Sequence, residues 1–227
     1  MAHRIRAIVA LLCRLHAFKF MDWRDATMGG IPVRVFRISF TGELSYEINI
    51  AATYGMAMWE RLMDAGENWN ITPYGTEAMH LLRAEKGFII VGQETDGTMT
   101  PGDCRMDWIV SKKKGDFIGK RSLFRSDTLR TDRKQLVGLM TKDPNIVLME
   151  GAQVIETPHE QEGRTPMSGH VTSSYFSPNL GRSIAMGVVK SGAQRLGETI
   201  YVAQPGGGAA IACTITETDF LSLDLDA

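Results

Sequence analysis

Apolar and polar residues alternate in two short stretches near the start of the chain. The alternation runs through residues 33–39 and again through 46–50, which is the two-residue period of a strand with one buried face. Thr41 and Gly42 lie between the two stretches and mark a turn. Tyr46 and Glu47 are consecutive, so their side chains must point to opposite faces of the predicted sheet.

A helical spacing follows these strands. Apolar positions recur every three to four residues through 54–65, and Gly66 ends the run. A second helix is predicted to begin at Thr72, an N-cap residue followed by proline, and to end before Gly87. Arg83 falls in its last turn. The first part of the chain is therefore predicted to be α+β.

The next segment has mixed signals. Residues 88–92 are an apolar run of strand length, and turn residues fill 97–103. A lysine-rich loop at 112–116 precedes a predicted helix at 118–124. Residues 125–134 are rich in Arg, Asp, Ser and Thr and contain few apolar residues, a composition typical of a linker.

Beyond this linker the chain consists of short apolar runs separated by Gly, Pro, Asn or Ser. Their regular spacing predicts a small antiparallel barrel or sandwich. The glycine triplet at 206–208 lies between the last two runs and predicts a hairpin loop. The six runs are Leu136–Met140, Val154–Ile155, Gly169–Thr172, Ile184–Val189, Ile200–Val202 and Ala210–Ile215.

Charge and cysteine content argue against several classes of protein. With 25 Lys and Arg against 26 Asp and Glu, the chain lacks the basic excess typical of proteins that bind nucleic acid or anionic membranes. We therefore expect neither partner. Cys13, Cys104 and Cys213 are far apart and odd in number, which favours neither a zinc site nor a disulfide framework. A reducing cytoplasm is the expected location.

Common catalytic and nucleotide-binding motifs are not found in the sequence. It contains no GxGxxG after a strand, no GxxxxGK[ST] and no GxSxG. His80, His159 and His170 are scattered, and a structural role is the simplest interpretation of each. The acidic residues at 94–96 lie in a turn without metal-ligand spacing, so no metal site is predicted.

Two charged residues remain open to more than one interpretation. Glu47 is either an ordinary outward-facing strand residue or a carboxylate that binds a ligand. Arg83 is either a helix-surface residue paired with a neighbouring acid, an interaction of little energetic weight, or part of the same binding site. A strand carboxylate with a helix-borne guanidinium would suit a planar heterocycle rich in hydrogen-bonding groups.

Several segments form an ordered series along the chain: RVFRISFTGELSYEINI at 34–50, RAEKG at 83–87, KGDFIGK at 114–120, GHVTSS at 169–174, SPNL at 177–180 and IAMG at 184–187. Together these segments resemble the glycine-cleavage aminomethyltransferase family. The resemblance starts near Phe18 and implies a folate-binding domain, of which only the second half is present, followed by a C-terminal β-barrel. It divides the chain into a non-family leader at 1–17, the partial aminomethyltransferase domain at 18–130 and the barrel at 131–227.

Residues 73–97, PYGTEAMHLLRAEKGFIIVGQETDG, most resemble the sarcosine oxidase branch of this family. In that branch the alpha subunit captures the one-carbon unit from sarcosine oxidation on tetrahydrofolate, which gives 5,10-methylene-tetrahydrofolate. The resemblance implies tetrahydrofolate as the ligand of this chain, FMN, FAD and NAD on other parts of the complex, and other sarcosine oxidase subunits as partners. It implies that Glu47 hydrogen-bonds the pterin edge, with Tyr46 and Arg83 as further folate-binding residues.

Some positions depart from the family pattern. Met79 stands where glycine-cleavage members have an arginine that contacts folate, which favours the sarcosine oxidase branch, and Phe220 stands where the family tends to have tyrosine. The family's catalytic Asp belongs to the first half of its domain, so we expect no catalytic residue here and a fragment that is inactive alone. The alternatives are a glycine-cleavage aminomethyltransferase, a folate-dependent demethylase and an inert scaffold fragment.

Overall fold

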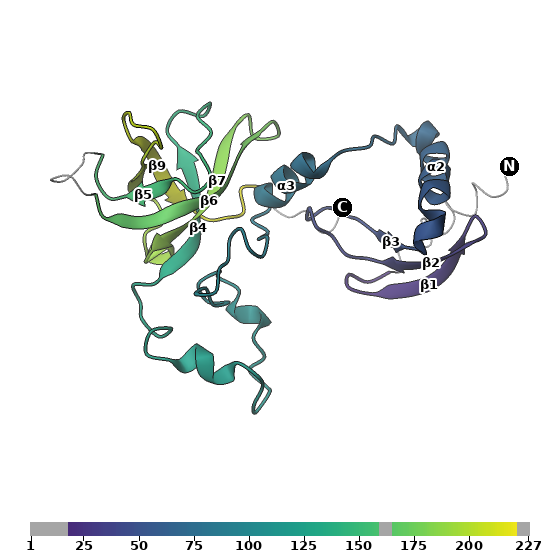
Figure 1. The fold of residues 1–227 in the computed structure, drawn as a ribbon, viewed down its shortest axis with the longest axis horizontal. Helices are drawn as coiled ribbons and strands as arrows, with labels where there is room; N and C mark the ends of the chain where they lie inside the picture. Colours follow the sequence, from purple (N-terminus) through teal and green to yellow (C-terminus); the bar gives the residue numbers. More distant parts are fainter. Residues whose placement is uncertain (1–17, 159–164, 222–227) are drawn as a thin grey trace. The chain divides into compact units, whose positions relative to one another are not determined.

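The computed structural model describes residues 18–158 and 165–221, in two compact units (Figure 1). Of the described residues, 18–79 belong to the amino-terminal unit, and 80–158 with 165–221 belong to the barrel unit. The domain limits expected at residues 17 and 130 stay predictions, and the leader before Phe18 and Cys13 within it lie outside the described residues. Across the described ranges, no helix is long and apolar enough to cross a membrane.

The amino-terminal unit is built on a three-stranded antiparallel sheet, in the order β1-β2-β3. The strands are β1 (Trp23–Met28), β2 (Ile31–Phe36) and β3 (Glu47–Asn49). The two predicted strands correspond to β2 and β3. Strand β1 was not predicted, because its sequence WRDATM does not alternate between apolar and polar residues. Gly29 and Gly30, with φ of 57° and 90°, form the two-residue β1–β2 turn, where positive φ is required.

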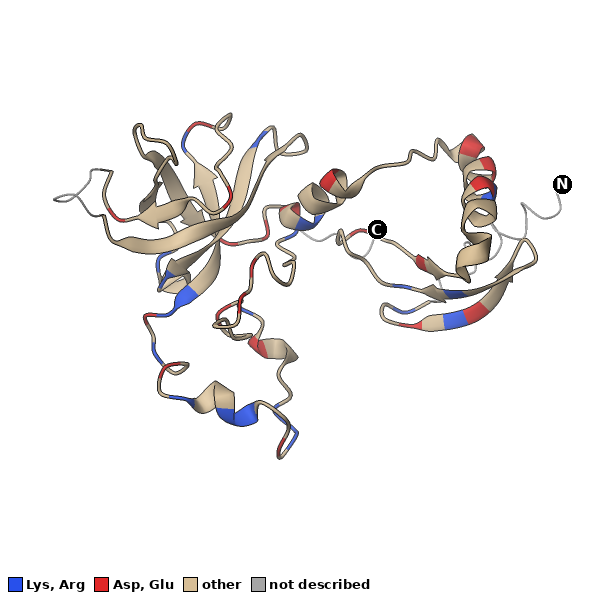
Figure 2. Ribbon diagram, viewed as in Figure 1, with Lys and Arg blue, Asp and Glu red and all other residues tan. Residues whose placement is uncertain are grey.

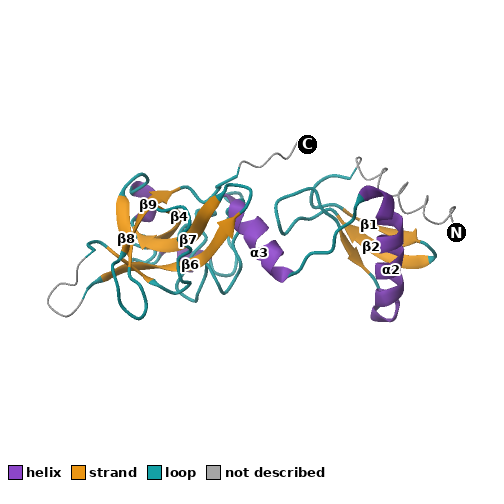
Figure 3. Ribbon diagram, turned by 90° about the horizontal axis from the view of Figure 1, so that it is seen from above, coloured by secondary structure: helices purple, strands orange, loops and turns teal. Residues whose placement is uncertain are grey.

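One face of this sheet forms the core of the amino-terminal unit. In β2, Ile31, Val33 and Val35 are buried and alternate with exposed residues, so the strand has one inner and one outer face. Helix α2 (Gly55–Gly66) covers the inner face (Figure 3) and contributes the buried Met58 to the same apolar cluster. The outer face of the sheet carries the polar residues.

Helix α3 (Thr76–Glu85) begins later than predicted. Thr72 was expected to cap it, but the Thr72 hydroxyl donates to the carbonyl of Asn70 at 3.1 Å. A capping hydroxyl instead accepts from a backbone N–H of the first turn, and the first turn of α3 begins four residues later, at Thr76. The predicted N-cap at Thr72 is therefore wrong.

The end of α3 agrees with prediction, but the strand expected after it does not form. Gly87 has φ of 71°, and the Phe88 and Gly87 amides bond the Arg83 and Ala84 carbonyls at 2.9 and 3.0 Å, the Schellman pattern that ends a helix. Residues 88–90 have no regular secondary structure, and residues 91–94 form a turn. The Ile90 carbonyl accepts from the amides of residues 93 and 94, so this stretch bonds locally rather than joining a sheet.

Turns and short 3-10 helices lead from there to the barrel. The predicted helix at 118–124 is a 3-10 helix, Lys120–Phe124, that begins after Gly119 with φ of 93°. The predicted linker at 125–134 is held in place, because the Arg133 guanidinium bonds the buried Asp103 carboxylate at 2.7 and 2.9 Å. The linker interpretation is therefore wrong at its C-terminal end.

The barrel unit contains a closed antiparallel barrel of six strands in the order β4-β7-β6-β5-β8-β9, with β9 pairing back to β4. All six predicted runs are strands, and the prediction of a small antiparallel barrel is confirmed. Residues 206–208 lie in the β8–β9 connection, all with positive φ. The strands are β4 (Lys134–Thr141), β5 (Gln153–Ile155), β6 (Met167–Ser177), β7 (Arg182–Lys190), β8 (Thr199–Val202) and β9 (Ile211–Thr216).

Alternating side chains fill the barrel interior, including Val137, Val189 and Ile215, which are fully buried. The strands approach closely at Gly169, where a Cβ would lie 1.9 Å from the Val188 carbonyl oxygen. The α+β fold with a C-terminal barrel, predicted from sequence, is thus present.

Candidate functional site

Glu47 lies on the outer face of the amino-terminal sheet, at the end of a row that crosses all three strands. Trp23 pairs with Phe36, and Phe36 pairs with Glu47, so the three side chains share one face. The Trp23 and Phe36 rings lie 6.5 Å apart. The Glu47 carboxylate is exposed and accepts from the Asn49 amide at 3.1 Å. An exposed carboxylate thus lies beside Phe36, at the end of a row that continues to Trp23.

A second row of polar residues runs beside the first. Asp25 pairs with Arg34, and Arg34 pairs with Asn49. The Arg34 guanidinium holds Asp25 by two bonds of 2.8 and 3.1 Å and lies 4.3 Å above the Trp23 ring. This bond from Arg34 lowers the pKa of Asp25 from its ordinary value. Asn49 ends the second row, and its side-chain amide donates to Glu47 at the end of the first.

A shallow hollow of about 590 Å³ opens beside these rows. It is lined by residues of all three strands and by Tyr54, among them Arg34, Phe36 and Asn49. Together with Glu47, the hollow offers an aromatic wall, amide and guanidinium donors and one carboxylate acceptor. These are the groups that a flat, polar ring system can stack on and bond to.

Tyr46 points to the opposite face, as the alternation predicted. It is half-buried in the core of the amino-terminal unit, and its ring stacks on Phe18 at 6.4 Å. In the described structure, Tyr46 therefore supports the strand that carries Glu47. A direct contact between Tyr46 and folate stays a prediction.

Arg83 belongs to the barrel unit and is fully buried. One terminal nitrogen donates to Glu94 at 2.8 Å and to the Phe88 carbonyl at 3.0 Å, and the other donates to the Ser173 hydroxyl at 2.6 Å. The guanidinium is thus committed to the fold of this unit. Two interpretations were open for Arg83, and the surface one is wrong. A direct folate contact stays a prediction.

Two buried carboxylates complete this network. Glu94 accepts from the Ile90 amide at 2.7 Å and from the Ser173 hydroxyl, while Glu85 accepts from the Ser177 hydroxyl and from the Asn179 amide at 2.9 Å. From sequence, Glu94 was expected in an ordinary turn, and its role as the buried partner of Arg83 was not predicted. A usable signal was the apolar run just before it, which indicates that the turn is buried.

The structure therefore separates the candidates into two groups. Glu47 is the first residue of β3, and Tyr46 comes directly before it. Arg83 lies in the other unit, with Glu94 and Ser173. The residues around Glu47 that the sequence analysis missed are Arg34, Phe36 and Asn49. Their strand register with β3 identifies them. Within the described ranges, no group of three His, Cys, Asp or Glu could hold a metal ion.

Comparison with known proteins identifies the class. Residues 4–114 match the GCVT N-terminal domain, and residues 134–221 match the glycine cleavage T-protein C-terminal barrel domain. The chain belongs to the glycine cleavage T-protein family, which confirms the predicted resemblance. The crystal structure of glycine cleavage system aminomethyltransferase T from Bartonella henselae has the same fold, with a TM-score of 0.74 and 24% identity over 93% of this chain and 56% of that one.

Sarcosine oxidase alpha subunits and aminomethyltransferases are both among the relatives of this chain. It is 55% identical over 81% of its length to sarcosine oxidase subunit alpha from Corynebacterium sp. (strain P-1) and 37% identical over 82% to that from Rhizobium meliloti (strain 1021). It is 31% identical over 83% of its length to the aminomethyltransferase of Halothermothrix orenii. The chain spans 19% of the two sarcosine oxidase subunits and 50% of the aminomethyltransferase. The predicted likeness to the sarcosine oxidase branch is confirmed.

Proposed function

We propose that this chain is the part of a sarcosine oxidase alpha-like protein that helps to bind tetrahydrofolate. In the intact system the reaction would transfer the one-carbon unit from sarcosine oxidation to tetrahydrofolate, giving 5,10-methylene-tetrahydrofolate. Other sarcosine oxidase subunits would be its partners, FMN, FAD and NAD would bind elsewhere in the complex, and the location would be the cytoplasm. The identity to sarcosine oxidase subunits supports this proposal most strongly.

Glu47 is the residue proposed to hold the pterin. Its carboxylate is exposed, and Asn49 holds it beside the Trp23–Phe36 pair. An ionised carboxylate that accepts two N–H donors from a pterin edge forms a charge-assisted pair. The half-buried ring of Phe36 lines the hollow beside Glu47 and is placed to contact the flat face of the same heterocycle.

Tyr46 and Arg83 enter this proposal as supporting residues. Tyr46 packs behind the strand that carries Glu47, and Arg83 fixes the end of α3 against the barrel strands through Glu94 and Ser173. Met79, which replaces an arginine expected in glycine-cleavage members, favours the sarcosine oxidase branch over a glycine-cleavage enzyme.

The test is a calorimetric titration of the 227-residue chain with tetrahydrofolate, in parallel with Glu47→Gln. The variant removes the negative charge and one acceptor, so binding should weaken by about 1–3 kcal/mol. Glu60→Gln is the matched control, because Glu60 is exposed on α2 of the same unit. Equal affinity of wild type and Glu47→Gln would refute the role of Glu47. If the wild type does not bind, the inert scaffold is favoured.

A second assay separates the enzyme alternatives. In the full-length alpha subunit, assembled with its partners, sarcosine turnover with tetrahydrofolate should yield 5,10-methylene-tetrahydrofolate, and Glu47→Gln should shift the product toward free formaldehyde. A chain that instead processes an aminomethyl group delivered by a carrier protein would be a glycine-cleavage enzyme. Demethylation of another methylamine would favour the demethylase.

A further inference from the structure

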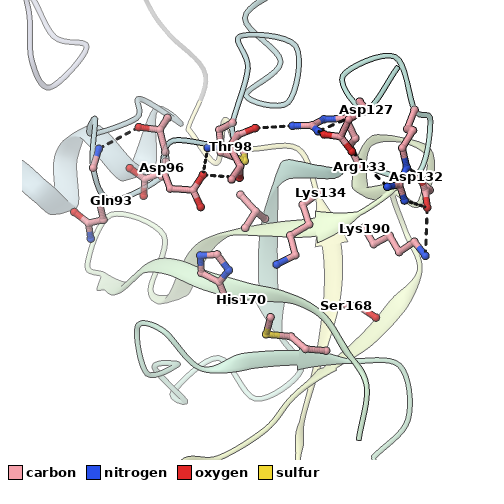
Figure 4. A pocket seen from close by; sticks show the side chains of 17 residues that line it. Gln93, Asp96, Thr98, Asp127, Asp132, Arg133, Lys134, Ser168, His170 and Lys190 are labelled. Carbon is pink, nitrogen blue, oxygen red and sulfur yellow. Dashed lines mark hydrogen bonds and ion pairs between the residues drawn. The ribbon is translucent and has the colours of Figure 1, made fainter. Parts of the chain in front are cut away.

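A cavity of about 520 Å³ lies on the outside of the barrel, in the unit that does not carry Glu47. Its base is formed by neighbouring strands β4, β7 and β6, where Lys134 pairs with Lys190, and His170 pairs with Val188. Paired residues on antiparallel strands share a face, so these side chains project into the same space (Figure 4). The loops at 92–99 and 127–133 form its walls.

Most charges around the cavity are neutralised by neighbours. Arg130 pairs with Asp132 at 2.8 Å, and Lys190 pairs with the same carboxylate at 3.5 Å. Arg133 is held by Asp103 at 2.7 Å and also pairs with Asp127. These side chains form a closed set of ion pairs at one end of the cavity.

Lys134 and His170 are different. Within the part of the chain that the structure describes, neither side chain has a hydrogen bond or ion pair, and both are only half-buried in the cavity. Figure 4 shows both side chains in its middle. Lys134 also lies directly opposite the cationic Lys190, and like charges at paired positions are unfavourable. An uncompensated basic group therefore lines the centre of the cavity.

Asp96 on the facing wall compensates this charge only in part. One of its carboxylate oxygens already accepts from the Thr98 amide at 2.7 Å and from the Thr98 hydroxyl at 2.6 Å, bonds that form the local turn. Asp127 and Asp132 are already engaged by Arg133, Arg130 and Lys190, so Asp96 is the remaining source of negative charge near Lys134 and His170. A small anion bound at Lys134 would meet less repulsion from Asp96 than a large polyanion would.

The ionisation of His170 reflects these neighbours. Burial lowers the pKa of His170, the Lys134 ammonium lowers it further, and Asp96 opposes both effects. Lys190, the other charged residue of these strands that lines the cavity, is paired with Asp132. The neutral imidazole is thereby favoured, and it keeps one ring N–H as a donor.

We propose that this cavity binds a small oxyanion, a carboxylate or a phosphate group, between the Lys134 ammonium and the His170 ring N–H. The ammonium supplies charge and up to three donors, and the imidazole supplies one directed donor. The anion also relieves the repulsion between Lys134 and Lys190. The Asp96 wall restricts the site to small ligands. This site differs from the proposed folate site and does not depend on it.

The test follows the His170 ring proton by NMR in the 227-residue chain, with inorganic phosphate and acetate as separate probes at constant ionic strength. His170→Gln assigns the resonance. Each anion that binds should cause a saturable shift and raise the pKa of His170 by about one unit, because a nearby negative charge favours the imidazolium. Saturation by phosphate, by acetate or by both supports the proposal and identifies the preferred head group.

Lys134→Gln should weaken binding at least tenfold and, without anion, should raise the pKa of His170, because it removes a repelling charge. Lys142→Gln is the matched control, an exposed lysine just after β4, and should behave as wild type. If Lys134→Gln does not fold, Lys134→Met replaces it with a side chain of similar length. The proposal is overturned if neither anion gives a saturable shift, or if wild type and the Lys134 variant shift equally.

Discussion

The buried Arg83–Glu94 pair provides the sharpest test of how the barrel unit is held together. We consider Arg83→Met, which keeps the length of the side chain but removes its charge. The variant leaves the Glu94 carboxylate buried with only the Ile90 amide and the Ser173 hydroxyl as donors. It also removes the bonds of 2.6 and 3.0 Å that Arg83 makes to Ser173 and to Phe88.

The size of the effect follows from burial. Side-chain exposure is 1% for Arg83 and 0% for Glu94, so solvent cannot compensate the remaining charge. Breaking such a buried pair costs about 3–5 kcal/mol, a large part of the roughly 5–15 kcal/mol by which a domain is stable. The double variant Arg83→Met/Glu94→Gln removes both charges and keeps an acceptor for Ile90. It should recover at least half of the loss.

The assay must report on the barrel rather than on the whole chain. Trp23, Trp59 and Trp69 lie in the amino-terminal unit and only Trp108 in the barrel unit, so tryptophan fluorescence is unsuitable. Hydrogen exchange of peptides from β6 and β7 is suitable, because their amides exchange through opening of the barrel. Each 1.4 kcal/mol or so corresponds to a factor of ten. The protection of these amides in Arg83→Met should therefore decrease by a factor of between about a hundred and a few thousand.

Two results would contradict this reasoning. Wild-type protection in Arg83→Met would mean that the pair contributes nothing to the barrel. A double variant as unstable as Arg83→Met would mean that an uncompensated charge on Glu94 is not the cause. Ser173→Ala measures the hydroxyl alone and should cost about 1–3 kcal/mol.

Three further predictions concern the barrel unit. Burial raises the pKa of Asp103, but the bond from Arg133 outweighs it and keeps this pKa below its ordinary value. The ionised Asp103 carboxylate therefore stabilises the folded chain at neutral pH, and this stabilisation is lost as pH falls below about 4. Asp103→Asn should therefore lower stability in urea unfolding at pH 7 and have little effect at pH 2–3. Gly169→Ala should strongly destabilise the barrel, since the new Cβ would meet the facing backbone at 1.9 Å, whereas Gly97→Ala, with open space around it, should be tolerated; a thermal melt compares them, and equal melting would refute the steric argument. Burial raises the pKa of the Cys213 thiol to about 12, so iodoacetamide should label Cys213 only after the barrel unfolds, and fast labelling of the native chain would contradict its burial.

The barrel strands could be predicted from sequence because each is a short apolar run between turn residues. Their closure could not, since Leu139 pairs with Ile215 across a long stretch of chain, and no local pattern encodes such pairing. The opposite orientations of Tyr46 and Glu47 could be predicted, because alternation along one strand fixes which face each side chain takes. The partner of Arg83 was missed, because Glu94 lies among polar turn residues that indicate solvent until the buried Ser173 of β6 is seen beside it.

The two units differ in whether their sheets have open edges, and open edges can pair with other molecules at high concentration. All six barrel strands are paired on both sides, so the barrel offers no row of free backbone donors to another molecule. The amino-terminal sheet instead has β1 and β3 at its edges. Arg24 and Asp25 place charge along β1 (Figure 2), and β3 has only three residues, both of which discourage edge-to-edge pairing. The amino-terminal sheet thus relies on charge and on a short edge strand to avoid pairing with other molecules, whereas the closed barrel needs neither.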